Sequence, residues 1–262
     1  MNNFNNVFSN QNMVVVNKNH KDLLIYELLI NAINISLYRE KIVVAGDTGI
    51  FLYENYPRIL HSISFKVISQ KFNADGIKSI IKALNCDKLF YTIKIGSCTF
   101  INSNKLKFDL NIIDNQNTIL TGTSIIFEKY FEKKDSILYK NLYLKFLDVK
   151  ANVLIEQKEM LIVDTIRNIL DNNIFSPLYI ELERLHYLLT TTYNSGELQS
   201  NLKDYIKNYE HCSTINEVIF SLEKLFNNDF YYEQIMTYIS KNKFKEYTDY
   251  IISKLKNANK LL

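Results

Sequence analysis

The hydrophobic periodicity of this chain changes near Glu156, and the change limits the folds that the chain can adopt. Between residues 88 and 155 the period approaches two, which is typical of strands with one buried face. After Glu156 apolar residues recur every three to four positions, which is typical of amphipathic helices. We therefore predict an α+β domain over residues 1–160, followed by an all-α helical bundle domain over residues 161–262.

Six segments of the first region have the alternation and the polar boundaries of strands. They cover residues 89–95, 98–101, 106–113, 119–127, 137–146 and 149–155, and Gly96-Ser97 is interpreted as a turn between the first two. Helices are predicted at residues 20–40 and around residues 77–84. In residues 105–111 the alternation places Lys107 and Asp109 on one face and the apolar side chains on the other.

Five or six short helices joined by polar loops are predicted after Glu156. Ser176-Pro177 has the form of a helix start, with proline at the first helical position. Thr214-Ile215-Asn216-Glu217 has the form of a capping box, in which the threonine and the glutamate each satisfy a backbone N–H of the first turn.

The composition indicates a globular protein of the reducing cytoplasm. No apolar run approaches the roughly 18 residues that span a bilayer, and the Asn-rich start lacks the basic and apolar regions of a signal peptide. The three cysteines, Cys86, Cys98 and Cys212, are scattered and fit neither a zinc site nor a disulfide framework. We therefore expect a cytoplasmic protein with no membrane partner.

The small net charge of +3 is unevenly distributed along the chain. Residues 1–167 hold 21 Lys and Arg against 16 Asp and Glu, whereas residues 168–262 hold 10 against 12. The basic excess of the first region suits an anionic ligand.

Several enzyme classes are excluded by missing motifs. The sequence has no GxxxxGK[ST] phosphate loop, no GxGxxG dinucleotide turn, no GxSxG nucleophile elbow and no HExxH zinc helix. The four histidines, His20, His61, His186 and His211, are isolated from one another in the sequence.

Residues 42–69 contain the strongest candidate for a ligand site. A short apolar strand leads into a turn at Gly46-Asp47-Thr48-Gly49, a helix is predicted over residues 50–56, and residues 62–68 alternate as a second strand. A glycine turn between a strand and a helix places backbone N–H groups beside a sheet edge, which is a common way to build a phosphate site.

Asp47-Thr48-Gly49 also has the form of the aspartic-protease triplet. That chemistry needs two carboxylates that share a proton, and the chain has no second D-[ST]-G. A homodimer of the retroviral type would be required, but those proteases are small all-β chains, whereas a helical pattern follows the triplet here. We do not favour this interpretation.

The same stretch resembles the nucleotidyltransferase toxins of abortive-infection and type IV toxin–antitoxin systems. The resemblance consists of Gly46-Asp47-Thr48 after an apolar strand, a short helix, Arg58 and then a second strand. It implies a nucleotidyltransferase-like mixed sheet with flanking helices, and the variable helical region after the sheet also suits the family. It further implies an NTP substrate, Mg²⁺ as cofactor, an RNA or protein acceptor and an antitoxin protein as partner.

In that family the turn reads G-G-T or G-G-S, and a D-x-D motif lies on the next strand. Residues i and i+2 of a strand point the same way, roughly 7 Å apart, so two carboxylates can share a pair of Mg²⁺ ions. These ions bind the triphosphate and activate the attacking hydroxyl. The glycine turn supplies N–H donors to the phosphates.

This chain departs from the family pattern at the metal site. Gly46 and Thr48 match the turn, but Asp47 replaces its second glycine. Ser62 and Ser64 occupy the two carboxylate positions, and a neutral hydroxyl is a poor Mg²⁺ ligand.

The resemblance therefore implies the following site. Gly46, Thr48, Arg58, Ser62 and Ser64 are the candidate nucleotide-binding residues. Asp109, which corresponds to the family's third carboxylate on a later strand, and Asp47 are the candidate catalytic and metal-binding residues.

Two functions remain open at this point. In the first, Asp47 and Asp109 hold a metal in an altered site, and the protein transfers a nucleoside monophosphate from an NTP to an RNA or protein acceptor. In the second, the domain is a catalytically degenerate binding module for a nucleotide, a nucleic acid or a protein. An aspartate in the glycine turn repels phosphates unless a metal bridges them, which argues against an ordinary triphosphate cradle. The transferase is our first hypothesis and the binding module the alternative.

Overall fold

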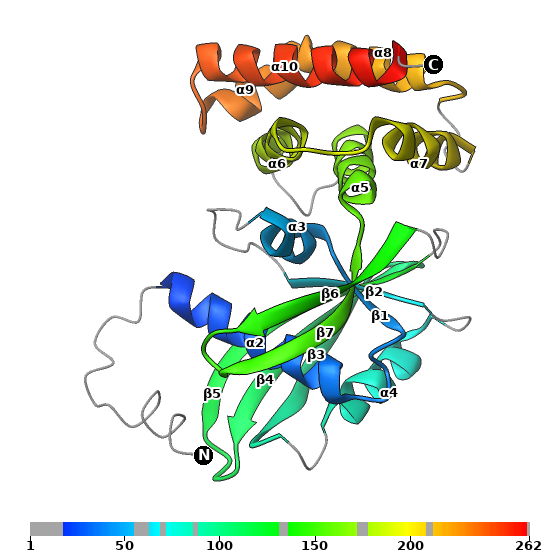
Figure 1. Cartoon of the computed structure of the whole chain (residues 1–262). Helices are drawn as coiled ribbons and strands as arrows, with labels where there is room; N and C mark the ends of the chain where they lie inside the picture. Colours follow the sequence, from blue (N-terminus) through cyan, green and yellow to red (C-terminus); the bar gives the residue numbers. More distant parts are fainter. Residues whose placement is uncertain are drawn as a thin grey trace. The chain divides into compact units, whose positions relative to one another are not determined.

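The chain forms two compact units, Met1–Glu156 and Gln157–Leu262, which we call the sheet unit and the helical unit (Figure 1). The computed structural model describes residues 18–54, 63–68, 72–85, 89–130, 136–171, 178–207 and 212–260. The division falls between the last strand and the first helix that follows it. The domain boundary expected after residue 160 lies within that helix.

A mixed seven-stranded sheet, counted over the described residues, forms the sheet unit. Its strands are β1 (Ile42–Ala45), β2 (Ile63–Val67), β3 (Tyr91–Asn102), β4 (Lys105–Asp114), β5 (Ile119–Lys129), β6 (Ile137–Leu144) and β7 (Val149–Glu156). They lie in the order β3-β4-β5-β2-β1-β7-β6. The pairs β2–β5 and β1–β7 are parallel and the other pairs are antiparallel. The short strands β1 and β2 therefore lie at the centre of the sheet.

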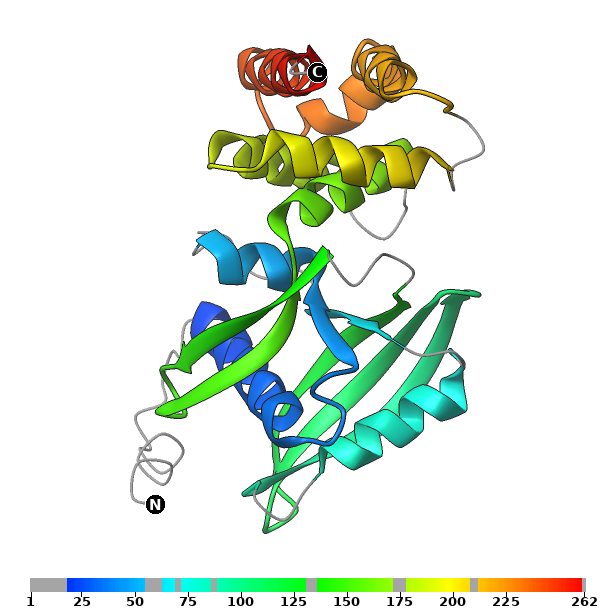
Figure 2. The same cartoon turned by 45° about the vertical axis from the view of Figure 1, so that its right-hand side comes forward.

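Helices α2 (Lys18–Ile35) and α4 (Ala74–Leu84) cover one face of this sheet (Figure 2). The predicted alternation of β4 is confirmed, since Leu106, Phe108 and Leu110 are buried in the core beneath these helices. The strand pairing places Ser64, Lys66, Asp109 and Glu156 on the opposite face. We call this opposite side the polar face.

The helix predicted at residues 20–40 ends earlier, at Ile35. The Ser36 hydroxyl donates to the Ile33 carbonyl at 3.0 Å and accepts from the Tyr38 backbone N–H at 3.1 Å. This local bonding offers the backbone an alternative to the helical ladder, so the chain turns towards β1. The helix expected at residues 50–56 also differs, because α3 (Gly46–Glu54) begins at the glycine turn itself.

The two strands predicted at residues 89–95 and 98–101 form one strand, β3. Gly96, which we interpreted as part of a turn, instead lies at a shift in the register between β3 and β4. A Cβ atom there would lie 3.3 Å from the Asp109 carbonyl oxygen. Gly96 therefore lets the two strands approach each other closely at a bulge, and it does not form a turn.

Six helices form the described part of the helical unit. They are α5 (Lys158–Leu170), α6 (Leu178–Thr190), α7 (Ser195–Lys207), α8 (Ile215–Phe226), α9 (Asp229–Met236) and α10 (Lys241–Lys260). The predicted capping box is present, with one change of partner. Thr214 accepts from the Glu217 backbone N–H at 3.2 Å, while the Glu217 carboxylate accepts from the Ser213 N–H at 2.7 Å. Ser176-Pro177 lies outside the described residues. Among the helices of the described residues, none is sufficiently long and apolar to cross a bilayer.

Glu27 of α2 fastens this helix to the turn between β6 and β7. Its Oε2 atom accepts from the backbone N–H groups of Phe146 at 2.7 Å and Leu147 at 3.2 Å. Burial raises the pKa of Glu27 above its ordinary value, although these hydrogen bonds and the charge of Lys145 act in the opposite direction. The bonds therefore do not fully offset the cost of burying the carboxylate.

We expect Glu27→Ala to lower the free energy of unfolding by about 1–3 kcal/mol, because two partly buried N–H groups lose this acceptor. Glu27→Gln retains an acceptor and has no proton to lose. The folded wild-type protein holds that proton at pH values where the unfolded chain has released it, so its stability falls as the pH rises through this window. The stability of Glu27→Gln relative to wild type should therefore increase as the pH rises above about 4.5, the ordinary pKa of a glutamate, in urea titrations. A pH-independent difference would contradict this prediction.

Candidate functional site

Gly46 forms the turn between β1 and α3 in a conformation that only glycine adopts easily. Its φ angle is +55°, and a Cβ atom there would lie 3.3 Å from the Ser64 Cβ and 3.5 Å from its Oγ. The left-handed backbone and the missing side chain let the turn lie directly against β2. The chain therefore brings Ser64, which we expected at this site, into contact with the glycine turn.

Thr48 fastens the first turn of α3 to β2. The backbone N–H of Ser64 donates to the Thr48 Oγ1 at 3.0 Å, and Ala45 of β1 is paired with Ser64 in the antiparallel register. The Thr48 oxygen acts as an acceptor in this bond, so its hydroxyl proton remains able to donate to another oxygen. The side chain of Thr48 is fully buried, so its role in this structure is to hold the turn against β2.

Asp47 lies between these two residues, in the first turn of α3. It is buried, with 8% of its surface exposed. A carboxylate in the first turn of a helix interacts favourably with the helix dipole. The position of Asp47 in this first turn is therefore favourable for a carboxylate. Asp47 is also adjacent in sequence to Gly46 and Thr48, so the candidate phosphate site carries a carboxylate.

Asp109 lies on a different part of the polar face. Its Oδ1 accepts from the Ser124 hydroxyl at 2.5 Å, and its Oδ2 accepts from the Ser97 hydroxyl. These two bonds, first that of Ser124, hold the pKa of the Asp109 carboxyl below its usual range, with a smaller contribution from Lys107. Half of the side chain is exposed. The group is thus a stable carboxylate that faces solvent.

The strand order separates Asp109 from the glycine turn. β5 lies between β4 and β2, so Asp109 is two strand spacings, roughly 10 Å, from β2. The structure therefore brings together Gly46, Asp47, Thr48 and Ser64, but it places Asp109 apart from them. Arg58 and Ser62 lie outside the described residues. Within the described ranges, no group of three or more His, Cys, Asp or Glu side chains could hold a metal ion.

A buried ion pair on the polar face was not predicted from the sequence. The Lys66 Nζ lies 2.5 Å from the Glu156 Oε1, and the two side chains are 2% and 0% exposed. The ammonium group also lies 5.9 Å from the centroid of the Tyr130 ring. Lys66 follows Ser64 by two residues on the same face of β2, so the pair connects the candidate site to the end of β7 across β1.

The structure was compared with solved structures. It matches JHP933 from Helicobacter pylori over 91% of this chain and 92% of that chain, with 16% sequence identity and a TM-score of 0.50. The chain shares the fold of JHP933. The predicted α+β fold class is confirmed, with a mixed sheet, flanking helices and a following helical bundle.

Two further solved structures are similar to a lesser degree. A proposed nucleotidyltransferase from H. pylori has 16% identity, a TM-score of 0.47, and coverage of 91% of this chain and 95% of that chain. An antigenic nucleotidyltransferase-like protein from Paracoccidioides brasiliensis has 10% identity, a TM-score of 0.45, and coverage of 72% and 88%. No protein-family model matches the sequence, and no curated protein matches it.

We expect Gly46→Ala to lower the free energy of unfolding by about 1–2 kcal/mol, because alanine is strained at a positive φ and its Cβ presses on Ser64. Gly196→Ala is the matched control. It lies in the first turn of α7, where a Cβ would make an ordinary contact at 3.4 Å with the Asn194 Oδ1. Thermal unfolding followed by circular dichroism measures both. Equal effects of the two substitutions would contradict the assigned role of Gly46.

Lys66→Met should cost about 3–5 kcal/mol, because it leaves the Glu156 carboxylate buried without its cation. The double variant with Glu156→Leu should be less destabilised than Lys66→Met alone, since it removes both charges. Lys78→Met breaks the exposed pair with Asp75 and should change stability by about 0.5 kcal/mol or less. Additive effects of the two buried substitutions would show that the ion pair makes no energetic contribution.

Proposed function

We propose that this protein is nucleotidyltransferase-like in function as well as in fold. It binds a nucleoside triphosphate at the Gly46 turn and transfers the nucleoside monophosphate to an RNA or protein acceptor. The observation that carries the proposal is the close contact of the Gly46 turn with Ser64 of β2. This contact places the first backbone N–H groups of α3 beside the strand that carries the acidic pair in the resembled family.

Each residue of the turn has a role in this proposal. Gly46 lets the backbone approach the phosphates, and the N–H groups at the start of α3 donate to phosphate oxygens. Thr48 positions these N–H groups, because its oxygen accepts from the Ser64 N–H and so holds the start of α3 against β2. Arg58 contacts the triphosphate or the acceptor. Ser62 and Ser64 line the nucleotide site as neutral hydroxyls.

The donor set at the turn fits Mg²⁺ only in part. Mg²⁺ in nucleotide sites is commonly held by one or two carboxylates together with phosphate oxygens. Asp47 supplies one carboxylate at the turn, whereas Asp109 lies two strands from β2. We propose Asp47 as the ligand of an ion at the turn, which would supply charge neutralisation for the triphosphate, and Asp109 as the ligand of a second ion that Asp47 does not share.

A second function is favoured by the neutral Ser64 and by the serine partners of Asp109. The Asp109 carboxylate accepts from Ser97 and Ser124, which gives it a structural role between β3, β4 and β5. If Asp109 has this structural role and does not bind a metal, the domain is a catalytically degenerate module. It binds a nucleotide, a nucleic acid or a protein and does not transfer a nucleoside monophosphate. The toxin-type role and an antitoxin partner belong to the first function alone.

Calorimetric titration with each NTP, with and without Mg²⁺ or Mn²⁺, distinguishes these functions. We expect metal-dependent binding that falls roughly ten-fold or more in Asp47→Asn, because a charged ligand is lost. Asp109→Asn tests the second ligand, and Asp75→Asn, an exposed carboxylate of α4, is the control with the same change of charge.

Each outcome has one interpretation. Loss of metal-dependent binding in both Asp47→Asn and Asp109→Asn supports a two-carboxylate site, and loss in Asp47→Asn alone supports a one-carboxylate site. NTP binding that needs no metal supports the binding module, and absence of NTP binding contradicts the transferase. Incubation with labelled NTPs and total tRNA then tests transfer directly.

A further inference from the structure

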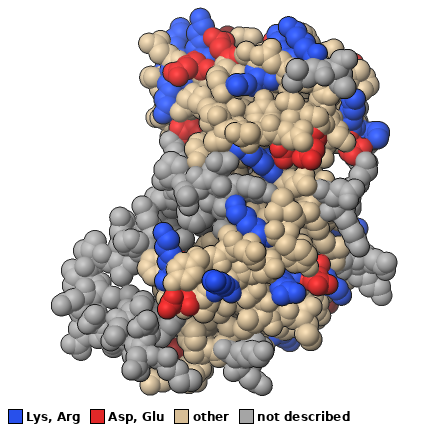
Figure 3. All heavy atoms as spheres, viewed as in Figure 1, with Lys and Arg blue, Asp and Glu red and all other residues tan. Residues whose placement is uncertain are grey.

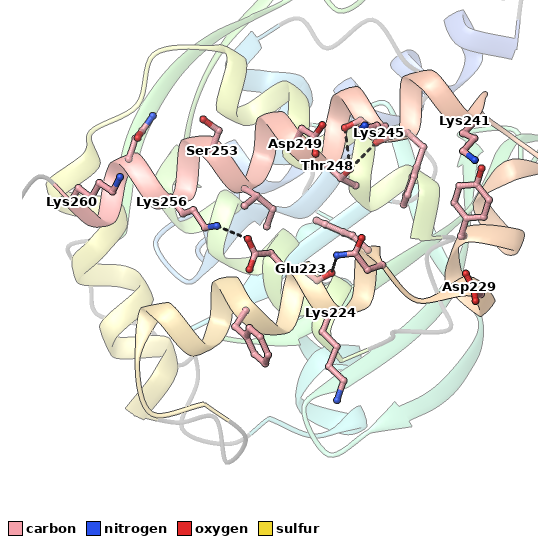
Figure 4. A pocket seen from close by; sticks show the side chains of 17 residues that line it. Glu223, Lys224, Asp229, Lys241, Lys245, Thr248, Asp249, Ser253, Lys256 and Lys260 are labelled. Carbon is pink, nitrogen blue, oxygen red and sulfur yellow. Dashed lines mark hydrogen bonds and ion pairs between the residues drawn. The ribbon is translucent and has the colours of Figure 1, made fainter.

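The helical unit carries a groove between α8 and α10, to which α9 contributes Asp229 and Tyr232 (Figure 4). The groove encloses about 1030 Å³, and all of its walls belong to the helical unit. Its floor contains the apolar side chains of Phe226, Phe244 and Ile252. The site proposed for the nucleotide lies in the sheet unit, so this groove is a separate feature of the molecule.

Lysines dominate the charge of this groove. α10 contains six lysines and two carboxylates, although residues 168–262 as a whole have an acidic balance. Five lysines line the groove against the three carboxylates of Glu223, Asp229 and Asp249: Lys224, Lys241, Lys245, Lys256 and Lys260. Lys256 is paired with Glu223 at 2.5 Å. Lys224, Lys245 and Lys260 have no ion-pair partner within the part of the chain that the structure describes. Basic side chains are also visible along the α8 and α10 side of the helical unit in Figure 3.

The spacing of these lysines suits an extended anion. Lys241 and Lys245 lie one helical turn apart, as do Lys256 and Lys260, so each pair presents two charges roughly 6 Å apart on one side of α10. The pairs lie at the two ends of the groove (Figure 4). The axial rise of a helix places their midpoints roughly 22 Å apart. A single small anion cannot contact both ends, whereas a chain of phosphates can.

Aromatic side chains accompany the lysines. Phe220 of α8 lines the groove and is 65% exposed, which is unusual for a phenylalanine on a helix that also packs into the core. The ring of Tyr232 lies 5.7 Å from the Lys241 Nζ. Exposed aromatic rings between cations are the platform on which unpaired bases stack. A folded duplex keeps its bases stacked on one another and would leave these rings unused.

Polar groups of α10 lie among these lysines. Asp249, Ser253 and Asn257 line the groove from α10, and all three are exposed. A carboxylate repels phosphate, but it accepts a hydrogen bond from a ribose 2′-hydroxyl, which DNA lacks. We propose that the α8–α10 groove binds single-stranded RNA, with the lysine pairs on its phosphates, Phe220 on a base and Asp249 on a 2′-hydroxyl. This inference does not depend on the transferase function, because no residue of the Gly46 turn takes part in it.

An acidic protein segment is the main competing occupant. It would satisfy the lysines, and Asp229 and Asp249 would repel it as they repel phosphate, but it has no ribose hydroxyl to donate to Asp249 and would make no specific use of the exposed Phe220 ring. The combination of cations, an exposed ring and central acceptors therefore favours RNA over an acidic peptide.

The test is fluorescence anisotropy of the full chain with a labelled single-stranded RNA of about twelve nucleotides, over a range of salt concentrations. The Lys245→Ala/Lys260→Ala variant should bind at least roughly ten-fold more weakly, and the slope of log affinity against log salt should become shallower by roughly 1.4. Phe220→Ala should weaken binding at least roughly five-fold with an unchanged slope, because it removes stacking and no charge.

Lys203→Ala/Lys207→Ala is the matched control, since it removes two exposed lysines of α7 outside the groove. It should leave the affinity and the slope almost unchanged. Equal losses in the two double variants, or no binding of RNA at low salt, would overturn the proposal. DNA of the same sequence should bind more weakly, and equal binding would overturn the assignment to RNA. Displacement of the RNA by polyglutamate at equal charge concentration would favour an acidic protein partner instead.

Discussion

The close approach of the Gly46 turn to Ser64 determines how the candidate site is built. A positive φ at Gly46 turns the chain from β1 into α3, and the absence of a side chain lets this turn lie against β2. The bond from the Ser64 N–H to Thr48 then fixes the helix on the strand. Because β1 and β2 are the two short central strands of the sheet, this contact lies where the two parallel pairs meet. Both proposed functions of the sheet unit depend on it.

The fold could be predicted wherever one periodicity extended over a whole element. The alternation of β4 and the helical stripes after Glu156 had this property, and both were confirmed. Errors arose where a local bond or a close contact decided the outcome. The Ser36 hydroxyl ended α2 before its apolar pattern ended, and Gly96 served a bulge in β3 where its sequence context indicated a turn. The bonds of Ser36 are local and the contact of Gly96 is with a residue elsewhere in the chain, Asp109, and hydrophobic periodicity specifies neither.

The candidate site was predictable in the turn and less so across the sheet. Gly46, Thr48 and Ser64 belong to one short stretch of sequence, so their proximity follows from a single strand–turn–helix–strand unit. The position of Asp109 depends on strand order, and no local pattern places β5 between β4 and β2. The Lys66–Glu156 pair was missed for a related reason. In the sequence, Lys66 and Glu156 are each a single charged residue in an apolar strand. Their pairing follows from the strand order, in which β2 and β7 are both neighbours of β1.

The serine at position 64 and the aspartate at position 47 are electrostatically consistent with each other. Ser64 lies against the glycine turn that carries Asp47, so a carboxylate at position 64 would bring a second negative charge to the turn, and two like charges close together raise the pKa of one of them unless a cation bridges the pair. The neutral serine removes this repulsion, and the dipole of α3 stabilises the remaining charge. The candidate site thus has its carboxylate in the turn and a neutral hydroxyl on the strand. A metal held by Asp47 would lie closer to the backbone N–H groups at the start of α3 than to β4, so the turn is the part of the candidate site on which the proposed transferase activity would depend.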